Sequence, residues 1–308
     1  MITKATRSAG GGVMRSGMDM VAVLLVLSMA GAAMTGCGSR SVDQAGFQAA
    51  ARVAVVSVVM SPVADAAREE NRSVMQAAVN RASEQARNGL AGIRSWSVID
   101  PVKEQKGKAV RSFGIVANGD LAGLFPDGEA RKRAQGSVHA QLSAWKGELI
   151  GSEGLAVVPR SAFAPAEEGQ ETDPVVRTVM LQQAGTLCGA LQVDAVAFVQ
   201  VRARINHPRA AAFIVTDSRT DGMLTMAQTL VIIDRSGRVI VDMGWPPLDK
   251  IARSRDLLPL YRGAGRDAVR DENIDLGDPK KKIPAAFTAL VDETAADLMT
   301  ALRKAVAQ

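Results

Sequence analysis

A nearly unbroken apolar run, Arg52–Met60 (RVAVVSVVM), constrains the fold of this chain more than any other segment. A continuous run of apolar, mostly β-branched residues is typical of a strand that is buried on both faces of its sheet. Such a sheet needs a covering layer on each side. Apolar residues at helical spacing follow over 69–93, and the short strand pattern WSVID follows over 96–100. Strand, helix and strand in this order predict parallel strands joined by a right-handed crossover. We therefore expect an α/β fold.

The rest of the chain continues this alternation of helix and strand patterns. Helical spacing recurs in three segments, 129–150, 175–191 and a final one opened by Ile283-Pro284. Strand patterns occupy 154–159, 194–205, 223–234 and 238–243. The last two strands are separated by Arg235-Ser236-Gly237, which predicts a hairpin whose glycine adopts a positive φ. Together these patterns predict a single mixed β-sheet flanked by helices over 52–308, with a surface insertion at about 102–127, where no period is clear.

The N-terminal segment has the features of a secretory signal peptide over residues 1–36. Three basic residues and one acid occupy 1–19, and Met20–Ala33 then runs for 14 residues without a charge. That run is too short to cross a bilayer as a helix, which needs about 20 residues. Met14-Arg15 offers a more compact start, so residues 1–13 are a candidate extension upstream of the true first codon.

The sequence Met34-Thr35-Gly36-Cys37 resembles the bacterial lipobox, in which small residues precede a cysteine. The resemblance implies cleavage between Gly36 and Cys37 and acylation of Cys37, which becomes the first mature residue and binds the lipid bilayer through its acyl chains. A plain signal peptide that contains a cysteine is the alternative. Gly38 and Ser39 follow in place of Asp, which by resemblance to the sorting rule of enteric bacteria favours the periplasmic face of the outer membrane over the inner membrane. Residues 37–51 are interpreted as the lipidated cysteine and a short tether.

Short signatures in the second half of the chain resemble a known group of periplasmic domains. The strand motif VVPR at Val157–Arg160, the junction VDAV at Val193–Val196 and a turn formed by Asp234, Gly237, Val239 and Ile240 carry the resemblance. It is to the α/β domain shared by curli-secretion lipoproteins and the lipoprotein activators of penicillin-binding proteins, and it covers 52–60 and 129–308. The additional helix and strand over 69–100 depart from that pattern.

Sequence motifs for the common catalytic and metal sites are missing. The chain lacks a P-loop, a dinucleotide-type glycine motif and a nucleophile elbow. The stretch from Asp217 fails as a calcium loop because Arg219 stands where an acidic or amide ligand is required and Gln228 where a bidentate Glu is required. The two histidines, His139 and His207, are interpreted as a helix-surface and a turn residue. We therefore expect no enzyme activity, no cofactor and no metal.

Charge and cysteine content exclude two further classes. The net charge of +5 includes +2 from the N-terminal segment (Lys4, Arg7 and Arg15 against Asp19), which leaves a scattered +3 that does not predict nucleic-acid binding. Two cysteines cannot form a disulfide scaffold. Cys188, the mature cysteine besides Cys37, is expected to be buried as a small hydrophobe rather than reactive.

Basic clusters and one aromatic residue are the candidates for contact with a partner. The clusters are Arg131–Arg133, Arg253 with Arg255, and Lys280–Lys282, and Trp245 precedes two prolines after an apolar strand. Solvated loops and a packed strand exit are the alternatives.

The location and these candidates predict a membrane-anchored periplasmic lipoprotein that acts as a non-enzymatic interaction or accessory module for an envelope protein partner. Two alternatives remain open. One is a subunit of an outer-membrane secretion pore, which would need lipid-facing strand pairs of about 10 residues. The other is a ligand-binding lipoprotein, because a binding pocket leaves no local motif.

Overall fold

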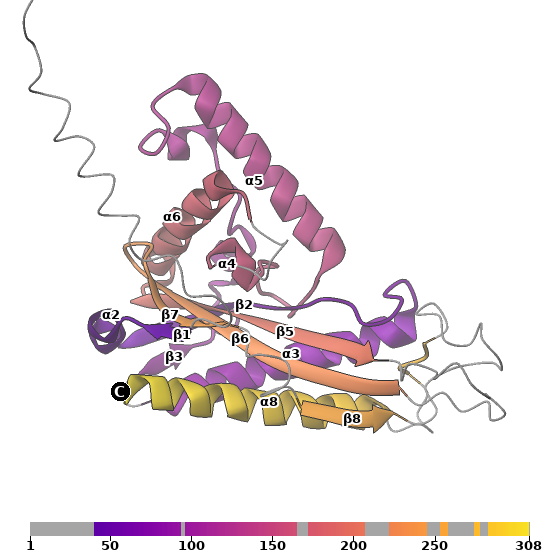
Figure 1. Ribbon diagram of the computed structural model, residues 1–308. Helices are drawn as coiled ribbons and strands as arrows, with labels where there is room; N and C mark the ends of the chain where they lie inside the picture. The colour runs from indigo at the N-terminus through magenta and orange to yellow at the C-terminus, as the bar shows by residue number, and fades with distance from the viewer. Residues whose placement is uncertain are drawn as a thin grey trace, which may run out of the picture. The chain divides into compact units, whose positions relative to one another are not determined.

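The computed structural model describes residues 40–93, 96–164, 172–206, 222–244, 253–257, 274–277 and 283–307. Within these residues, eight strands form one sheet in the order β1-β7-β6-β5-β2-β3, while β4 pairs with β2 and β8 pairs with β6 (Figure 1). The strands are β1 (Arg40–Val42), β2 (Arg52–Met60), β3 (Ser97–Ile99), β4 (Ile150–Gly151), β5 (Ala195–Asn206), β6 (Gly222–Asp234), β7 (Val239–Met243) and β8 (Arg253–Leu257).

The sheet is mixed, as predicted. Strand β2 runs parallel to β3 and β5, whereas the β5–β6, β6–β7 and β1–β7 pairs are antiparallel. Every residue of β2 from Val53 to Met60 is buried, as expected of a strand covered on both faces. The strands predicted over 52–60, 194–205, 223–234 and 238–243 are neighbours in the sheet, and the predicted α/β fold with a single mixed sheet is confirmed. Residues 1–39, including the predicted signal peptide, lie outside the described residues.

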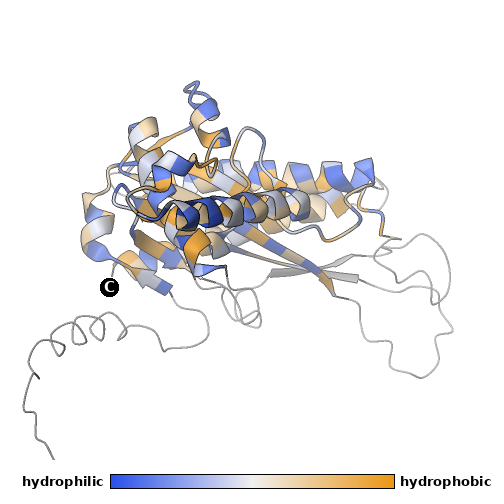
Figure 2. Cartoon of the chain, turned by 90° about the horizontal axis from the view of Figure 1, so that it is seen from above, coloured by the Kyte–Doolittle hydropathy of each residue, from blue (hydrophilic) through white to orange (hydrophobic). Residues whose placement is uncertain are grey.

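Helices cover both faces of this sheet (Figure 1). Helices α3 and α8 pack together on one face, and α4 and α6 lie on the other, with α5 packed on α6. Figure 2, seen from the α5 side, shows hydrophilic and hydrophobic residues alternating along the helices, as expected of amphipathic helices on a buried sheet. The helices are α2 (Gln44–Ala49), α3 (Glu69–Ala91), α4 (Gly107–Arg111), α5 (Gly128–Glu148), α6 (Pro174–Leu191) and α8 (Ile283–Val306), with 3-10 turns η1 (Asn118–Leu121) and η2 (Arg160–Ala162).

The segment 37–51 is not a simple tether, because residues 40–50 belong to the folded domain. Strand β1 pairs with the outer edge of β7, from Arg40 opposite Met243 to Val42 opposite Val241. Asp43 caps α2 by accepting a hydrogen bond from Gly46 N–H at 3.2 Å. Phe47 is buried against Trp96, with 4.4 Å between ring centroids. Pairing with the otherwise unpaired edge of β7 and the contact between Phe47 and Trp96 thus hold this segment in place.

The segment 102–127 is not a surface insertion either. It forms α4 and η1, and it contributes the buried side chains Val110, Phe113, Val116 and Leu121 to the core. The Phe113 ring lies 5.5 Å from that of Phe198 on β5 and 6.4 Å from that of Phe163. These residues lack a clear period because they pack as turns and short helices.

The segment 154–159, predicted as a strand, makes a single parallel bridge between Ala156 and Ser57. The Ser57 hydroxyl lies 2.9 Å from Ala156 O and 2.8 Å from Val158 O, and it accepts a hydrogen bond from Val158 N–H. A buried side chain on β2 therefore replaces the ladder that a regular strand would form.

The predicted hairpin is present between β6 and β7. These strands pair from Leu230 opposite Met243 to Ile233 opposite Val239. Gly237 adopts φ +77° in the turn, and Asp234 Oδ1 accepts hydrogen bonds from Ser236 N–H and Arg238 N–H. Both the strand boundaries and the positive φ agree with the sequence pattern.

Candidate functional site

Several of the predicted functional residues lie outside the described residues. They are Gly36 and Cys37 of the cleavage and lipidation motif, Trp245, His207 and Lys280–Lys282. The lipidation motif and the Trp245 contact therefore stay predictions.

Arg253 and Arg255 lie in β8, a strand that the sequence pattern did not predict. Strand β8 continues the line of β7 along β6, with Arg253 opposite Met226 and Arg255 opposite Leu224. The structure therefore places this basic pair in the sheet, beyond the end of the β6–β7 pairing.

The basic cluster Arg131–Arg133 begins helix α5. Asp127 caps this helix by accepting from Ala130 N–H at 2.7 Å, and Lys132 pairs with Glu129 at 3.2 Å. Lys132 and Arg133 are exposed, and so is His139 two turns further along. The expectation that His139 is a helix-surface residue is confirmed.

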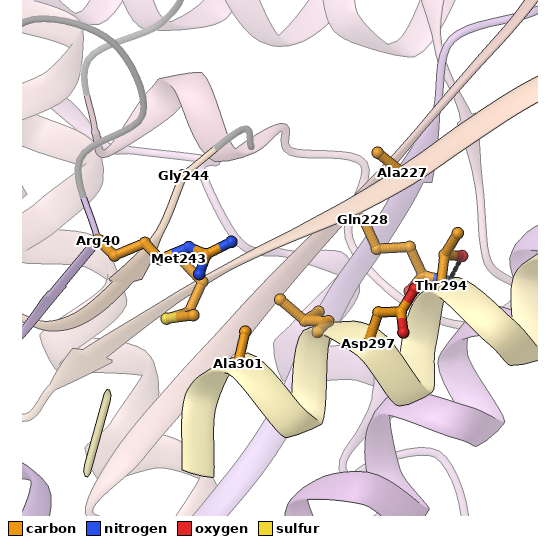
Figure 3. A pocket seen from close by; sticks show the side chains of 9 residues that line it. Arg40, Ala227, Gln228, Met243, Gly244, Thr294, Asp297 and Ala301 are labelled. Carbon is orange, nitrogen blue, oxygen red and sulfur yellow. Dashed lines mark hydrogen bonds between the residues drawn. The ribbon is translucent and has the colours of Figure 1, made fainter. Parts of the chain in front are cut away.

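A small hollow lies between the β1–β7–β6 edge of the sheet and α8 (Figure 3). Gln228 on β6 closes its inner end, and its Nε2 donates to Val291 O and Thr294 Oγ1, both at 2.9 Å. Arg40 reaches toward it from β1, and Asp297 and Ala301 line it from α8. Its cavity volume of about 20 Å³ has room for about one water molecule and not for an organic ligand.

A buried ion pair joins Arg160 of η2 to Asp242 of β7. Arg160 Nε donates to Asp242 Oδ1 at 2.9 Å, and the Arg160 backbone N–H donates to Gln200 Oε1 at 3.2 Å. Burial raises the pKa of Asp242, against the opposing charge and hydrogen bond of Arg160. The contact lies between η2 and the sheet face that also carries Phe198, so the pair joins the end of the VVPR segment to the sheet.

Cys188 is fully buried on α6, as the sequence led us to expect. Its Sγ lies 3.8 Å from Ile233 O, and burial raises the pKa of the thiol to about 12. The predicted burial is confirmed, and a thiol that stays protonated at neutral pH is a poor nucleophile.

Arg40 is the residue that the sequence analysis missed, because it was assigned to the tether. It is exposed at the start of β1 and lines the hollow beside α8. Asp43 followed by Phe47, an N-cap and an apolar residue one turn later, was the available signal, but a six-residue helix is too short to show a period.

Two wider properties concern the described residues alone. None of their helices is both long enough and apolar enough to cross a membrane. Among them, no group of three or more His, Cys, Asp or Glu side chains is arranged to hold a metal ion.

Comparison with known proteins yields little. No protein-family model matches the chain, and no curated protein matches it significantly. Among solved structures, a hypothetical protein from Chlamydia trachomatis is similar over 81% of this chain and 99% of its own, at 10% identity and a TM-score of 0.24. A similarity this weak supports no argument about fold or function.

Proposed function

We propose that this chain is a lipid-anchored lipoprotein of the bacterial envelope whose α/β domain is a non-enzymatic interaction or accessory module. The observation that carries the proposal is the lipobox-like sequence Met34–Cys37 after an uncharged run of signal-peptide length. Acyl chains on Cys37 would hold the protein at the membrane, each contributing about 0.8 kcal/mol per buried methylene. The resemblance to periplasmic lipoprotein domains agrees with the periplasmic face of the outer membrane as its location.

Two features of the described residues bear on the ligand-binding and pore alternatives. The hollow beside α8 is itself too small for an organic ligand, so it is not a candidate site for the ligand-binding alternative. The apolar face of the β5–β6 pair, including Ala203, Leu224 and Met226, is buried, and α8 packs against β6. If these parts of β5 and β6 formed a pore wall, this face would have to be open to lipid instead.

The anchor is tested by metabolic labelling with a fatty-acid probe in a bacterial host. We expect the wild type to be labelled and membrane-bound, and Cys37→Ala to lose both properties. Cys188→Ala is the matched control, because it removes the other cysteine of the chain and should leave labelling unchanged. A Cys37→Ala protein that stays membrane-bound in high salt would rule out the anchor.

The partner is tested by crosslinking in the native envelope. We expect a specific envelope protein to be captured, and its capture to weaken in Arg253→Ala, Arg255→Ala or Trp245→Ala. Lys146→Ala is the control, because Lys146 is an exposed basic residue on α5 that belongs to none of the candidate contact clusters. Equal capture by all four variants would exclude these residues as the contact.

A further inference from the structure

We propose that the β1 edge of the sheet and the C-terminal part of α8 form the surface that faces the lipid bilayer. We call this surface the anchor edge and define it as Arg40–Val42 with residues 297–307. The inference rests on the proposed function, because it requires acylation of Cys37, and it adds which side of the domain meets the membrane.

The length of chain between the anchor and the fold carries the first step. Only Gly38 and Ser39 separate Cys37 from the first residue of β1. A fully extended chain spans at most about 3.6 Å per residue, so the Cα atoms of Cys37 and Arg40 lie within about 11 Å of each other. An acylated Cys37 sits at the bilayer surface, which leaves Arg40 little freedom to move away from it.

Pairing and capping fix that attachment point to the body of the domain. The backbone of β1 pairs with β7, and Asp43 N–H donates to Ile240 O at 2.9 Å. Gln44 Nε2 donates to Ala305 O at 3.1 Å and so ties the segment after β1 to the end of α8. Arg40 and Ala301 line the same hollow (Figure 3). The acyl anchor is therefore attached next to an ordered edge of the folded domain and not to a flexible tail.

A flat membrane can approach a folded domain closely at one point only if the surface around that point faces it. The exposed residues of the anchor edge include Ser41 on β1 and Lys304 and Ala307 at the end of α8. The opposite side of the sheet is formed by β3 and β4, which both pair with β2, and exposed Glu153 lies in the turn that follows β4. The five strand spacings from β1 to β4 place these two sides about 24 Å apart.

Charge makes a small contribution at the anchor edge. Arg40, Arg303 and Lys304 are balanced in part by Asp43 and Asp297. The short connection to the acyl chains, and not electrostatic attraction to anionic headgroups, thus sets the orientation. The contrast between the two sides should persist in high salt.

The test compares fluorescent labels at the two sides of the lipidated full-length protein. Ala307→Cys and Glu153→Cys, each combined with Cys188→Ala, are labelled and reconstituted in phosphatidylethanolamine and phosphatidylglycerol vesicles that contain a headgroup-linked quencher. We expect the label at residue 307 to be quenched several-fold more strongly than the label at residue 153. Insertion of a long Gly/Ser linker between Ser39 and Arg40 should remove the difference, because it frees the domain to turn.

The outcomes separate the inference from the function on which it rests. Protein that floats with the vesicles but shows equal quenching at both sites, or stronger quenching at residue 153, overturns the orientation and leaves the anchor intact. Protein that does not float with the vesicles overturns the anchor and the orientation together. Unchanged unfolding transitions of both labelled variants confirm that the fold is retained.

Discussion

The thiol of Cys188 and the carboxylate of Asp194 lie six residues apart, and the structure gives them opposite protonation behaviour. Burial keeps the Cys188 thiol protonated by raising its pKa to about 12. Burial also acts to raise the pKa of Asp194, but hydrogen bonds from Arg52 N–H and Ala51 N–H and the charge of Arg235 outweigh it and lower the pKa. Reactivity of Cys188 therefore reports on opening of the core, and ionisation of Asp194 links the stability of the domain to pH.

Cys188 should be unreactive toward a maleimide in the native Cys37→Ala protein and should react once the protein unfolds. The reason is twofold, since the thiol is inaccessible and the nucleophilic thiolate is scarce at neutral pH. Labelling followed by mass spectrometry across a urea titration measures this. Rapid labelling without urea would contradict the burial of α6 against β6.

Asp194→Asn should destabilise the domain by about 1–2 kcal/mol at neutral pH, because the carboxylate accepts from Ala51 N–H at 3.0 Å and Arg52 N–H at 2.9 Å. A carboxyl whose pKa is lowered by folding stabilises the protein above its unfolded-state pKa and loses that effect as the pH falls through its folded-state pKa. The difference between wild type and variant should therefore shrink below the usual value of 3.8. Urea unfolding over a pH series measures it, with exposed Glu148→Gln as the control; a constant difference would contradict the linkage.

Strand β1 and helix α2 carry the largest difference between the predicted and the observed elements. The sequence treats 38–51 as a polar tether, whereas the structure pairs β1 with β7 and buries Phe47 on Trp96. If that packing holds the segment, Phe47→Ala should lower the free energy of unfolding by about 3 kcal/mol. Chemical denaturation measures the loss, and Gln48→Ala, exposed on the same helix, should have little effect. Equal stability of the two variants would restore the tether interpretation.

The elements that could be predicted are those whose own residues carry a period. The β2 run, the long helices and the β6–β7 hairpin have enough residues for apolar spacing or turn chemistry to show. The three-residue β1 and the six-residue α2 do not, and their positions depend on partners about 200 residues away, on β7. The segment after Gly154 resembles a strand, but Ser57 determines its path.

The candidate sites follow the same division. The lipobox can be identified because its signal is local, in four consecutive residues. The Arg160–Asp242 pair could not be predicted, because its partners are 82 residues apart and the VVPR motif that contains Arg160 does not point to Asp242. The anchor edge needs both kinds of information, a local motif and a tertiary pairing.

The turn glycine of the hairpin allows a matched test of an element that was predicted correctly. Gly237 has φ +77°, and a Cβ there would lie 2.8 Å from the backbone oxygen of Leu181. Gly237→Ala should therefore cost at least about 1–2 kcal/mol of stability. Gly189→Ala on α6, where a Cβ meets nothing within 4 Å, should be neutral or slightly stabilising. Thermal unfolding of both variants gives the comparison, and similar effects at the two glycines would contradict the turn geometry.

At the scale of the whole molecule, α8 covers the apolar face of the β5–β6 pair, and this affects which assemblies the protein can form. Gln228 on β6 donates to Val291 O and Thr294 Oγ1 on α8, and Leu224 and Met226 lie on the same face of the strand as Gln228. This apolar face is therefore covered by a helix of the same chain. Arg81 of α3 in turn holds α8 through Asp292, with bonds of 2.8 and 3.1 Å.

A domain whose apolar sheet face is already covered should not assemble by exposing that face to lipid. We therefore expect the detergent-solubilised, lipidated protein to be a monomer or a small oligomer in light-scattering or native mass measurements. Gln228→Ala with Arg81→Ala removes side-chain bonds that hold α8, so it should lower stability without producing a larger assembly. A detergent-resistant ring would favour the pore alternative. The mass of the solubilised protein thus distinguishes an interaction module from a pore subunit.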